Sequence, residues 1–245
     1  SNCSLSGTWT FSQNCKIIGD GFLLDFVGNG GIVVERGSQL KLQNIVFEGL
    51  QENRIRCLDD AASIILDSCQ IALSDKYTFT QGAILFRNTN KFSGSNTFSL
   101  DSNMTSTIES DANIELYGNA RLAFARKNNN SPNEPIDFGN SISSIDILSG
   151  GLIVGPGGAT FKKGAIVSKG VTFLELDADA ILQVGDGTNY ANNCRVVFEG
   201  GAELDLETGT FKFNNVAIGA PTFNFSGKGT RFTVRSPATF TVSKA

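Results

Sequence analysis

The stretch Gly201-Ala-Glu-Leu-Asp-Leu-Glu-Thr-Gly-Thr-Phe-Lys-Phe213 decides the fold. Small or apolar residues occupy every second position on both sides of a polar corner at Glu207-Thr208. Successive side chains of a β-strand point to opposite faces, so this alternation is typical of two short strands that each bury one face. The intervening Glu203, Asp205 and Glu207 are expected to form an acidic rib in solvent.

The same pattern recurs along the chain. Other copies begin at Cys15, Ser38, Ala62, Ala112 and Ser143, and a partial copy begins at Ala178. With the copy at Ala202, the start-to-start distances are 23, 24, 50, 31, 35 and 24 residues. The distance of 50 fits two periods, with Gly82-Ala-Ile-Leu-Phe86 in the middle one.

A strand pair repeated at this period predicts a coil that stacks about 4.8 Å from the next one. No coil buries its apolar face alone, so stacking supplies the core. Inward side chains would then form columns, one of Ile17, Leu40 and Ile64 and another of Phe22, Ile45 and Cys69. We therefore predict an all-β, single-stranded parallel β-helix, a solenoid of about ten coils of roughly 24 residues, with residues 1–245 as one domain.

Two alternatives remain open at this point. Alternation with glycine-rich turns also fits a β-sandwich or barrel. Between Asn53 and Cys69, apolar residues also fall at helical spacing, which allows a local helix. The match in register with 38–49 and 202–213 favours strands there.

Composition excludes some classes of function. The chain has 245 residues, a net charge of -4 and interspersed charges, which argues against nucleic-acid binding. No apolar run approaches the ~20 residues of a membrane span, and residues 1–5 show no signal peptide. Alternation is still running at Lys244-Ala245, so we expect a fragment of a longer chain or a processed form.

The columns, the polar corners and the segment Cys15-Lys-Ile-Ile-Gly-Asp-Gly-Phe-Leu-Leu24 resemble the right-handed parallel β-helix of the pectate-lyase-like superfamily. Four short segments resemble the Phe-x-x-Asn and Gly-Gly-Ala-Ile repeats of autotransported outer-membrane passengers: Phe11-Ser-Gln-Asn14, Phe211-Lys-Phe-Asn214, Gln81-Gly-Ala-Ile84 and Lys163-Gly-Ala-Ile166. The chain is thus similar to large bacterial surface β-helix proteins. This resemblance implies an extracellular or bacterial cell-surface location and an adhesive or structural role. The usual chirality of parallel crossovers agrees with right-handedness.

The sequence contains few residues in a catalytic arrangement. Asp59-Asp60 and Arg54-Ile-Arg56 are weak candidates for the paired aspartates and basic motif of polysaccharide-degrading β-helix enzymes. Adjacent residues on a strand point to opposite faces, so the two carboxylates would not readily converge. The chain has no histidine, which removes the common triads and the commonest metal ligand. We predict no enzyme activity, no metal site and no cofactor, although Asp177, Asp179, Asp186 and Asn189 would permit incidental Ca²⁺ binding.

The five cysteines do not fix a compartment. Cys3 and Cys15 lie close in sequence and are the candidate disulfide. Cys69 falls at an inward position and is expected to be a buried thiol, and Cys57 and Cys194 are expected to be free.

Three polar segments break the period and are candidate protruding loops. They are 126–135, 155–158 with the adjoining lysines, and 185–193. Loops on a rigid scaffold often carry recognition residues. The candidate contact residues are Arg126, Lys127, Asn128, Asn129, Asn130, Lys162, Lys163, Asp186, Asn189 and Tyr190. Trp9 is expected to belong to an end coil rather than to a sugar platform.

The leading functional hypothesis is a non-enzymatic surface module for adhesion or structural display, with loops 126–135 and 185–193 as contact sites. Its expected partner is a host or cell-surface protein or glycan. One alternative is a polysaccharide-degrading enzyme acting through Asp59 or Asp60. Another is an oligomeric structural fibre whose end coils are covered by a partner.

Overall fold

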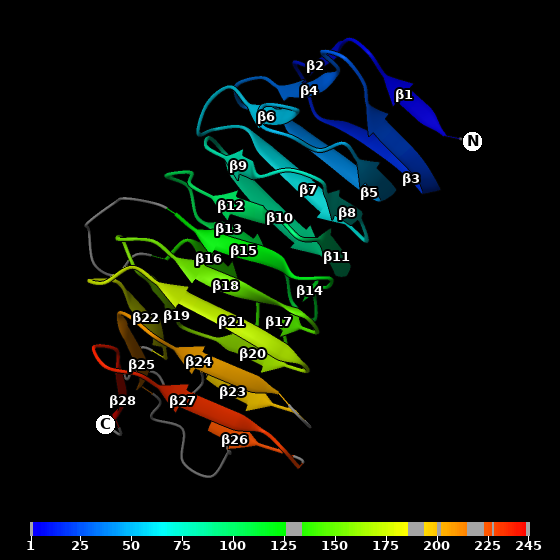
Figure 1. The fold of residues 1–245 in the computed structure, drawn as a ribbon. Helices are drawn as coiled ribbons and strands as arrows, with labels where there is room; N and C mark the ends of the chain where they lie inside the picture. The colour runs from blue at the N-terminus through cyan, green and yellow to red at the C-terminus, as the bar shows by residue number, and fades with distance from the viewer. Residues whose placement is uncertain are drawn as a thin grey trace.

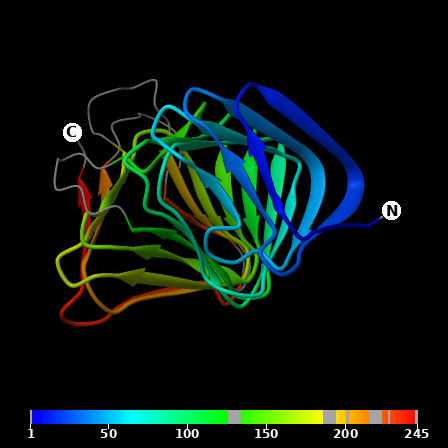
Figure 2. The same cartoon turned by 90° about the horizontal axis from the view of Figure 1, so that it is seen from above.

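The computed structural model describes residues 2–125, 134–185, 194–199, 202–214, 223–226 and 228–243. These residues form an all-β parallel β-solenoid of about 8 turns, in which the coils stack from the N-terminus to the C-terminus (Figure 1). Seen from above, the coils wrap around a common interior (Figure 2). The prediction of a parallel β-solenoid is therefore confirmed.

Each coil contributes one strand to each of three faces. Face 1 contains β7 (Ser63–Asp67), β10 (Ala83–Arg87), β13 (Ser106–Ile108), β16 (Ile136–Phe138), β19 (Ala159–Phe161), β22 (Ile181–Val184), β25 (Thr210–Asn214) and β28 (Thr239–Ser243). Face 2 contains β1 (Cys3–Leu5), β8 (Gln70–Leu73), β11 (Thr89–Gly94), β14 (Asn113–Leu116), β17 (Ser144–Ile147), β20 (Gly164–Ser168), β23 (Cys194–Phe198) and β26 (Phe223–Phe225).

Face 3 contains β2 (Thr8–Phe11), β4 (Gly31–Val34), β6 (Ile55–Cys57), β9 (Tyr77–Phe79), β12 (Thr97–Leu100), β15 (Ala120–Phe124), β18 (Gly150–Val154), β21 (Val171–Leu176), β24 (Glu203–Leu206) and β27 (Arg231–Val234). Two long strands run through the corner between faces 1 and 2, and these are β3 (Cys15–Phe26) and β5 (Gln39–Glu48). Because β5 pairs with both β7 and β8, it joins face 2 and the strands β7, β10, β13 and β16 of face 1 in one folded sheet of 14 strands. The other strands of face 1, β19, β22, β25 and β28, form a separate sheet of four.

The corner between faces 1 and 2 is made by residues with left-handed backbone. In five successive coils this residue is short and polar, and its φ lies between 46° and 62°: Asp20, Asn44, Ser68, Asn88 and Asp111. Short polar side chains tolerate this conformation because they bond locally to the backbone. The expectation of polar corners between alternating strands is thus confirmed at Asp20, Asn44 and Ser68.

Inward side chains from all three faces form one continuous core. Leu40 pairs with Ile64, and Ile64 pairs with Ile84, so aliphatic residues stack from coil to coil. Aromatic rings continue the stacking across faces, as where Phe92 contacts Phe86 and Phe98 at centroid distances of 6.2 and 4.8 Å. The core depends on contacts between coils, as predicted.

The local alternatives are also settled. Residues 55–57 and 63–67 form strands β6 and β7, so no helix occupies that segment. The coil inferred around Gly82–Phe86 exists and contains β10. The Trp9 side chain belongs to the end coil, because Trp9 pairs with the buried core residue Ile32.

Two details of the stacking prediction are wrong. There are about 8 turns rather than ten, because some coils carry insertions: Ser106 pairs with Ile136, 30 residues away. The predicted column of Ile17 with Leu40 is also wrong, since Ile17 pairs with Leu42 and Cys15 pairs with Leu40. The first corner holds three residues, 19–21, between paired positions where the second corner holds only one, and this shifts the register.

The candidate disulfide between Cys3 and Cys15 is not formed, and both cysteines are free thiols. Cys3 pairs with Leu24, which lies nine positions along β3 from Cys15 and beyond its corner. A disulfide needs Cα atoms within about 7 Å, and this register holds the two residues further apart.

Core stacking predicts that truncating an inward apolar side chain lowers the free energy of unfolding far more than truncating an outward one. We expect Phe92→Ala to lower the free energy of unfolding by about 3–5 kcal/mol, because a buried ring is lost from between two others. Ile18→Ala, at a side chain 52% exposed, is the control and should change it by less than about 0.5 kcal/mol. Urea unfolding followed by circular dichroism measures both. Equal effects would contradict the assignment of the core.

Candidate functional site

The aspartates considered for catalysis have separate structural roles. Asp59 Oδ1 accepts a hydrogen bond from the Ala61 amide at 3.0 Å, and its Oδ2 lies 3.3 Å from Arg36 Nε in the preceding coil. Asp60 Oδ1 faces the following coil, at 3.5 Å from the Gly82 amide. The two carboxylates therefore reach in opposite directions along the stack and do not converge.

The lysines predicted as a cationic contact patch have acidic neighbours from the previous coil. Lys162 pairs with Glu134, and Lys163 Nζ lies 3.6 Å from Asp137 Oδ1. Their charges are therefore largely balanced within the protein. The other candidate contact residues, Arg126, Lys127, Asn128, Asn129, Asn130, Asp186, Asn189 and Tyr190, lie outside the described residues.

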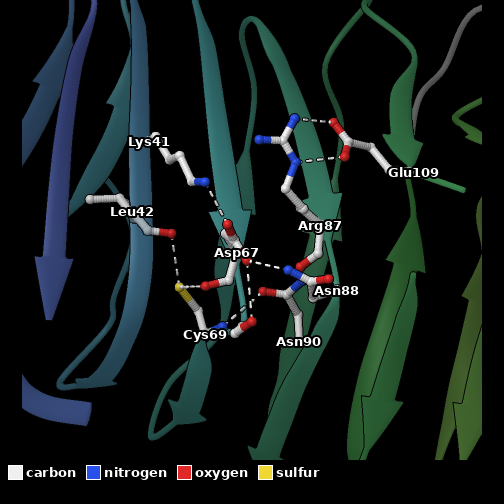
Figure 3. A network of polar contacts seen from close by, with 9 residues as sticks. Lys41, Leu42, Asp67, Cys69, Arg87, Asn88, Asn90 and Glu109 are labelled. Carbon is white, nitrogen blue, oxygen red and sulfur yellow. Dashed lines mark hydrogen bonds and ion pairs between the residues drawn. The ribbon is translucent and has the colours of Figure 1, made fainter. Parts of the chain in front are cut away.

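The most buried carboxylate, Asp67, lies at the corner between faces 1 and 2 (Figure 3). Lys41 Nζ lies 2.6 Å from its Oδ2, and Asn88 Nδ2 donates to its Oδ1 at 2.7 Å. Burial alone would raise the pKa of Asp67, but hydrogen bonds from Lys41, Asn88 and Ser68 and the charge of Lys41 outweigh burial and hold that pKa below its usual value. Asp67 is thus a charged anchor between three coils.

The same corner continues on both sides of Asp67 (Figure 3). Asn90 is fully buried, and its Oδ1 accepts from the Cys69 amide at 3.0 Å while its Nδ2 donates to the Arg87 carbonyl. Arg87 makes two 2.6 Å contacts to Glu109 in the next coil. This network joins successive coils at the corner, although Gln43 Oε1, in register with Asp67, is buried without a hydrogen-bond partner among the described residues.

The buried thiols are also structural. Burial raises the pKa of Cys69 to about 11, and the Cys69 thiol donates to the Leu42 carbonyl at 3.2 Å. Burial and the nearby Asp59 raise the pKa of Cys57 to about 12. Both side chains stay protonated at neutral pH, which makes them poor nucleophiles. The prediction of a buried thiol at Cys69 is confirmed.

A groove of about 380 Å³ lies on the outer side of face 3, between β21 and β24. It is lined by Thr172, Phe173, Leu174, Glu175, Glu203, Asp205, Glu207 and Thr208. The predicted acidic rib of β24 forms one wall and is paired with the next coil: Arg231 lies 3.1 Å from Glu203, and Arg235 lies 3.0 Å from Asp205. The groove therefore combines acceptor oxygens with an exposed aromatic ring.

The ring of Phe173 is positioned by residues from two earlier coils. Arg121, Gly151 and Phe173 occupy one outward column, in this order. The guanidinium of Arg121 lies 5.5 Å from the centroid of the Phe173 ring and 2.8 Å from Glu175. A side chain at Gly151 would collide with Phe173, because its Cβ would lie 2.3 Å from the Phe173 carbonyl oxygen. Gly151 thus leaves space for Arg121 to reach across two coils.

The candidate residues identified from the sequence do not include Phe173. The signal was present in Val171-Thr-Phe-Leu-Glu-Leu176, where Phe173 shares the phase of Glu175 rather than that of the inward Leu174. An aromatic residue on the phase of a charged residue indicates an exposed ring.

Among the described residues, no three histidine, cysteine or acidic side chains are grouped so as to hold a metal ion. Within the same ranges, no helix has the length and apolar character needed to cross a membrane. Comparisons with protein-family models, curated proteins and solved structures gave no match. The resemblance to known β-helices therefore stands at the level of architecture.

The network around Asp67 predicts a pH-dependent stability. A carboxyl whose pKa is lowered by folding contributes stability above its unfolded pKa, and this contribution is lost as the pH falls through the folded pKa. At neutral pH, we expect Asp67→Asn to lower the free energy of unfolding by about 2 kcal/mol. The difference from wild type should shrink below the usual pKa of 3.8.

Urea unfolding at neutral pH and in acid measures this difference. Asp60→Asn is the matched control, because Asp60 is exposed and makes one long hydrogen bond, so its effect should be small. A loss at Asp67→Asn that is equally large at both pH values would contradict the ion-pair assignment.

Proposed function

We propose that this chain is a non-enzymatic module of an extracellular or cell-surface protein, a rigid rod that binds a cell-surface protein or glycan through its side. The observation that carries the proposal is that charged side chains of the described residues make contacts between coils instead of forming a catalytic pair. The buried Asp67 joins three coils and the candidate catalytic aspartates turn toward different coils, whereas an aromatic ring on face 3 stays exposed beside a groove. This arrangement supports binding better than acid–base chemistry.

The geometry supports recognition on face 3 in particular. Phe173 is 40% exposed, and its orientation is set by Arg121 and by the space at Gly151. A ring held in one orientation loses little entropy on binding and presents a flat apolar surface. Carboxylates of β24 beside it supply acceptors for hydroxyl or amino groups of a partner.

The predicted contact loops are connected in sequence to strands of the coils near this groove. Loop 126–135 begins after β15, the strand of Arg121, and returns at β16. Loop 185–193 connects β22 to β23, in the coil that also contributes β24. We propose that loop 126–135, which connects face 3 to face 1, adds contacts to the partner that the groove recognises, and that loop 185–193, which connects face 1 to face 2, is a second contact site.

Binding to intact cells tests this function. Labelled protein should bind a cell surface, and Phe173→Ala should weaken that binding by about tenfold, because a preorganised aromatic contact is lost. Leu58→Ala is the matched control, since this side chain is 46% exposed but lies away from the groove. Replacing residues 126–133 by a short Gly-Ser linker should also weaken binding. Treating the cells with protease or glycosidase identifies the partner class.

Two results would overturn the proposal. One is equal cell binding by wild type and by both groove and loop variants. The other is the release of new reducing ends or unsaturated products from a panel of acidic and neutral polysaccharides, lost on replacing Asp59 or Asp60, which would establish the enzyme alternative.

A further inference from the structure

Two arginines on face 3, Arg54 and Arg56, depart from the pairing of charges between coils. Among the described residues, neither of them forms an ion pair. Other described arginines do form ion pairs with acidic side chains, and these are Arg36, Arg87, Arg121, Arg231 and Arg235. The positive charges of Arg54 and Arg56 are therefore available to a ligand.

Both arginines belong to the outer surface of the rod. They flank Ile55, a core residue of β6, so the alternation of the strand turns their side chains outward. β6 belongs to a sheet of three strands in which β4 lies between β2 and β6 (Figure 1). The surface beside the two arginines is therefore built by three successive coils of this chain.

A recess of about 310 Å³ lies between these coils. Gly31 of β4 lines it, pairs with Thr8 of β2 and lies against Arg54, because a Cβ on Gly31 would be 3.0 Å from the Arg54 carbonyl oxygen. Since Gly31 has no side chain, nothing at this position fills the outer surface between Thr8 and Arg54. The side chains of Asn29 and Asn53 also line the recess.

The Arg54 guanidinium is held in place by neutral partners. Its Nη1 donates to the Gly30 carbonyl oxygen at 2.8 Å, and its Nη2 donates to Gln51 Oε1 at 3.4 Å. A guanidinium has five N–H donors, so further donors remain for a ligand. An arginine whose orientation is already fixed loses little entropy when it binds an anion.

Arg56 supplies a second guanidinium on the same side of the strand. Its side chain is exposed, and within the described residues it makes no hydrogen bond or ion pair. Val33, in register with Arg56 on β4, is buried. The stem of an arginine can cover such an apolar neighbour while its guanidinium stays in solvent. Because Arg54 and Arg56 are two positions apart on one face, both can bind the same anion.

The donors of the recess suit an anion with more than two oxygens. The arginines lie on β6 and just before it, and the Thr8 hydroxyl lies across the recess on β2. A carboxylate has two oxygens in one plane, which a single guanidinium can match, whereas a sulfate or phosphate ester has oxygens in several directions. Two arginines and one acid, Glu52, line the recess, so its net charge is +1.

We propose that Arg54 and Arg56 form a binding site for a sulfate or phosphate ester carried by a partner molecule. The anion lies in the recess between the two guanidiniums and the Thr8 hydroxyl, and the rest of the recess receives the group that carries the ester. The site is independent of the groove around Phe173, which lies on other coils of face 3. A Phe173→Ala variant that binds cells like wild type would therefore leave this site unaffected.

Titration with inorganic anions tests the site. Isotope-labelled protein is titrated with sodium sulfate or with sodium phosphate at constant ionic strength, and NMR follows the Gly31 amide and the arginine side chains. We expect saturable shifts, and the anion that binds more tightly identifies the ester. Arg56→Gln should weaken binding about tenfold, because hydrogen bonds between charged groups are lost. Arg36→Gln is the matched control and should bind like wild type, since Arg36 is exposed and pairs with Asp59 outside the recess.

Two further variants separate charge from geometry. Arg54→Lys keeps the charge but lacks the planar fork, so it should weaken binding severalfold. Glu52→Gln removes the acid of the recess and should strengthen binding. Circular dichroism checks that each variant is folded. The proposal is overturned if neither anion gives a saturable shift, if Arg56→Gln binds like wild type, or if Arg36→Gln loses as much affinity as Arg56→Gln.

Discussion

Stacking of one coil on the next is the constraint on which the rest of this structure depends. A coil has three short strands and no layer of its own to cover its inward side chains, so the core exists only between coils. Burial at Leu40 therefore depends on Ile64, and burial at Ile64 depends on Ile84. The short spacing between coils also fixes which polar groups meet. A side chain is close to the paired residues of the coils before and after its own, whereas its neighbours in sequence point to the opposite face of the strand.

This constraint explains why the charged residues serve the fold. The ion pairs of Lys41 with Asp67, Arg87 with Glu109 and Lys169 with Asp146 all join successive coils. The hydrogen bond that Lys169 Nζ donates to Asp146 Oδ2 is the main reason that the pKa of Lys169 is raised. Asp59 and Asp60 follow the same rule, since they are adjacent in sequence but turn toward different coils. A catalytic pair would instead need two carboxylates to converge from neighbouring coils.

The sequence was sufficient for the architecture, since period-2 alternation and polar corners locate most strands and the buried Cys69. It was insufficient for register, because alternation fixes which face a residue occupies but not which residue it pairs with one coil later. Adding two residues to the first corner keeps every side chain on its face and still moves Ile17 from Leu40 to Leu42. The groove was missed for a related reason: it needs Arg121, Gly151 and Phe173 in one column, and their spacings of 30 and 22 residues become neighbours only once the insertions are known.

The same constraint limits what the sides of the rod offer a partner. Charges that are paired between coils and apolar side chains that point inward leave little for a partner to contact, so recognition depends on local departures from the pattern, such as the exposed Phe173 beside Gly151.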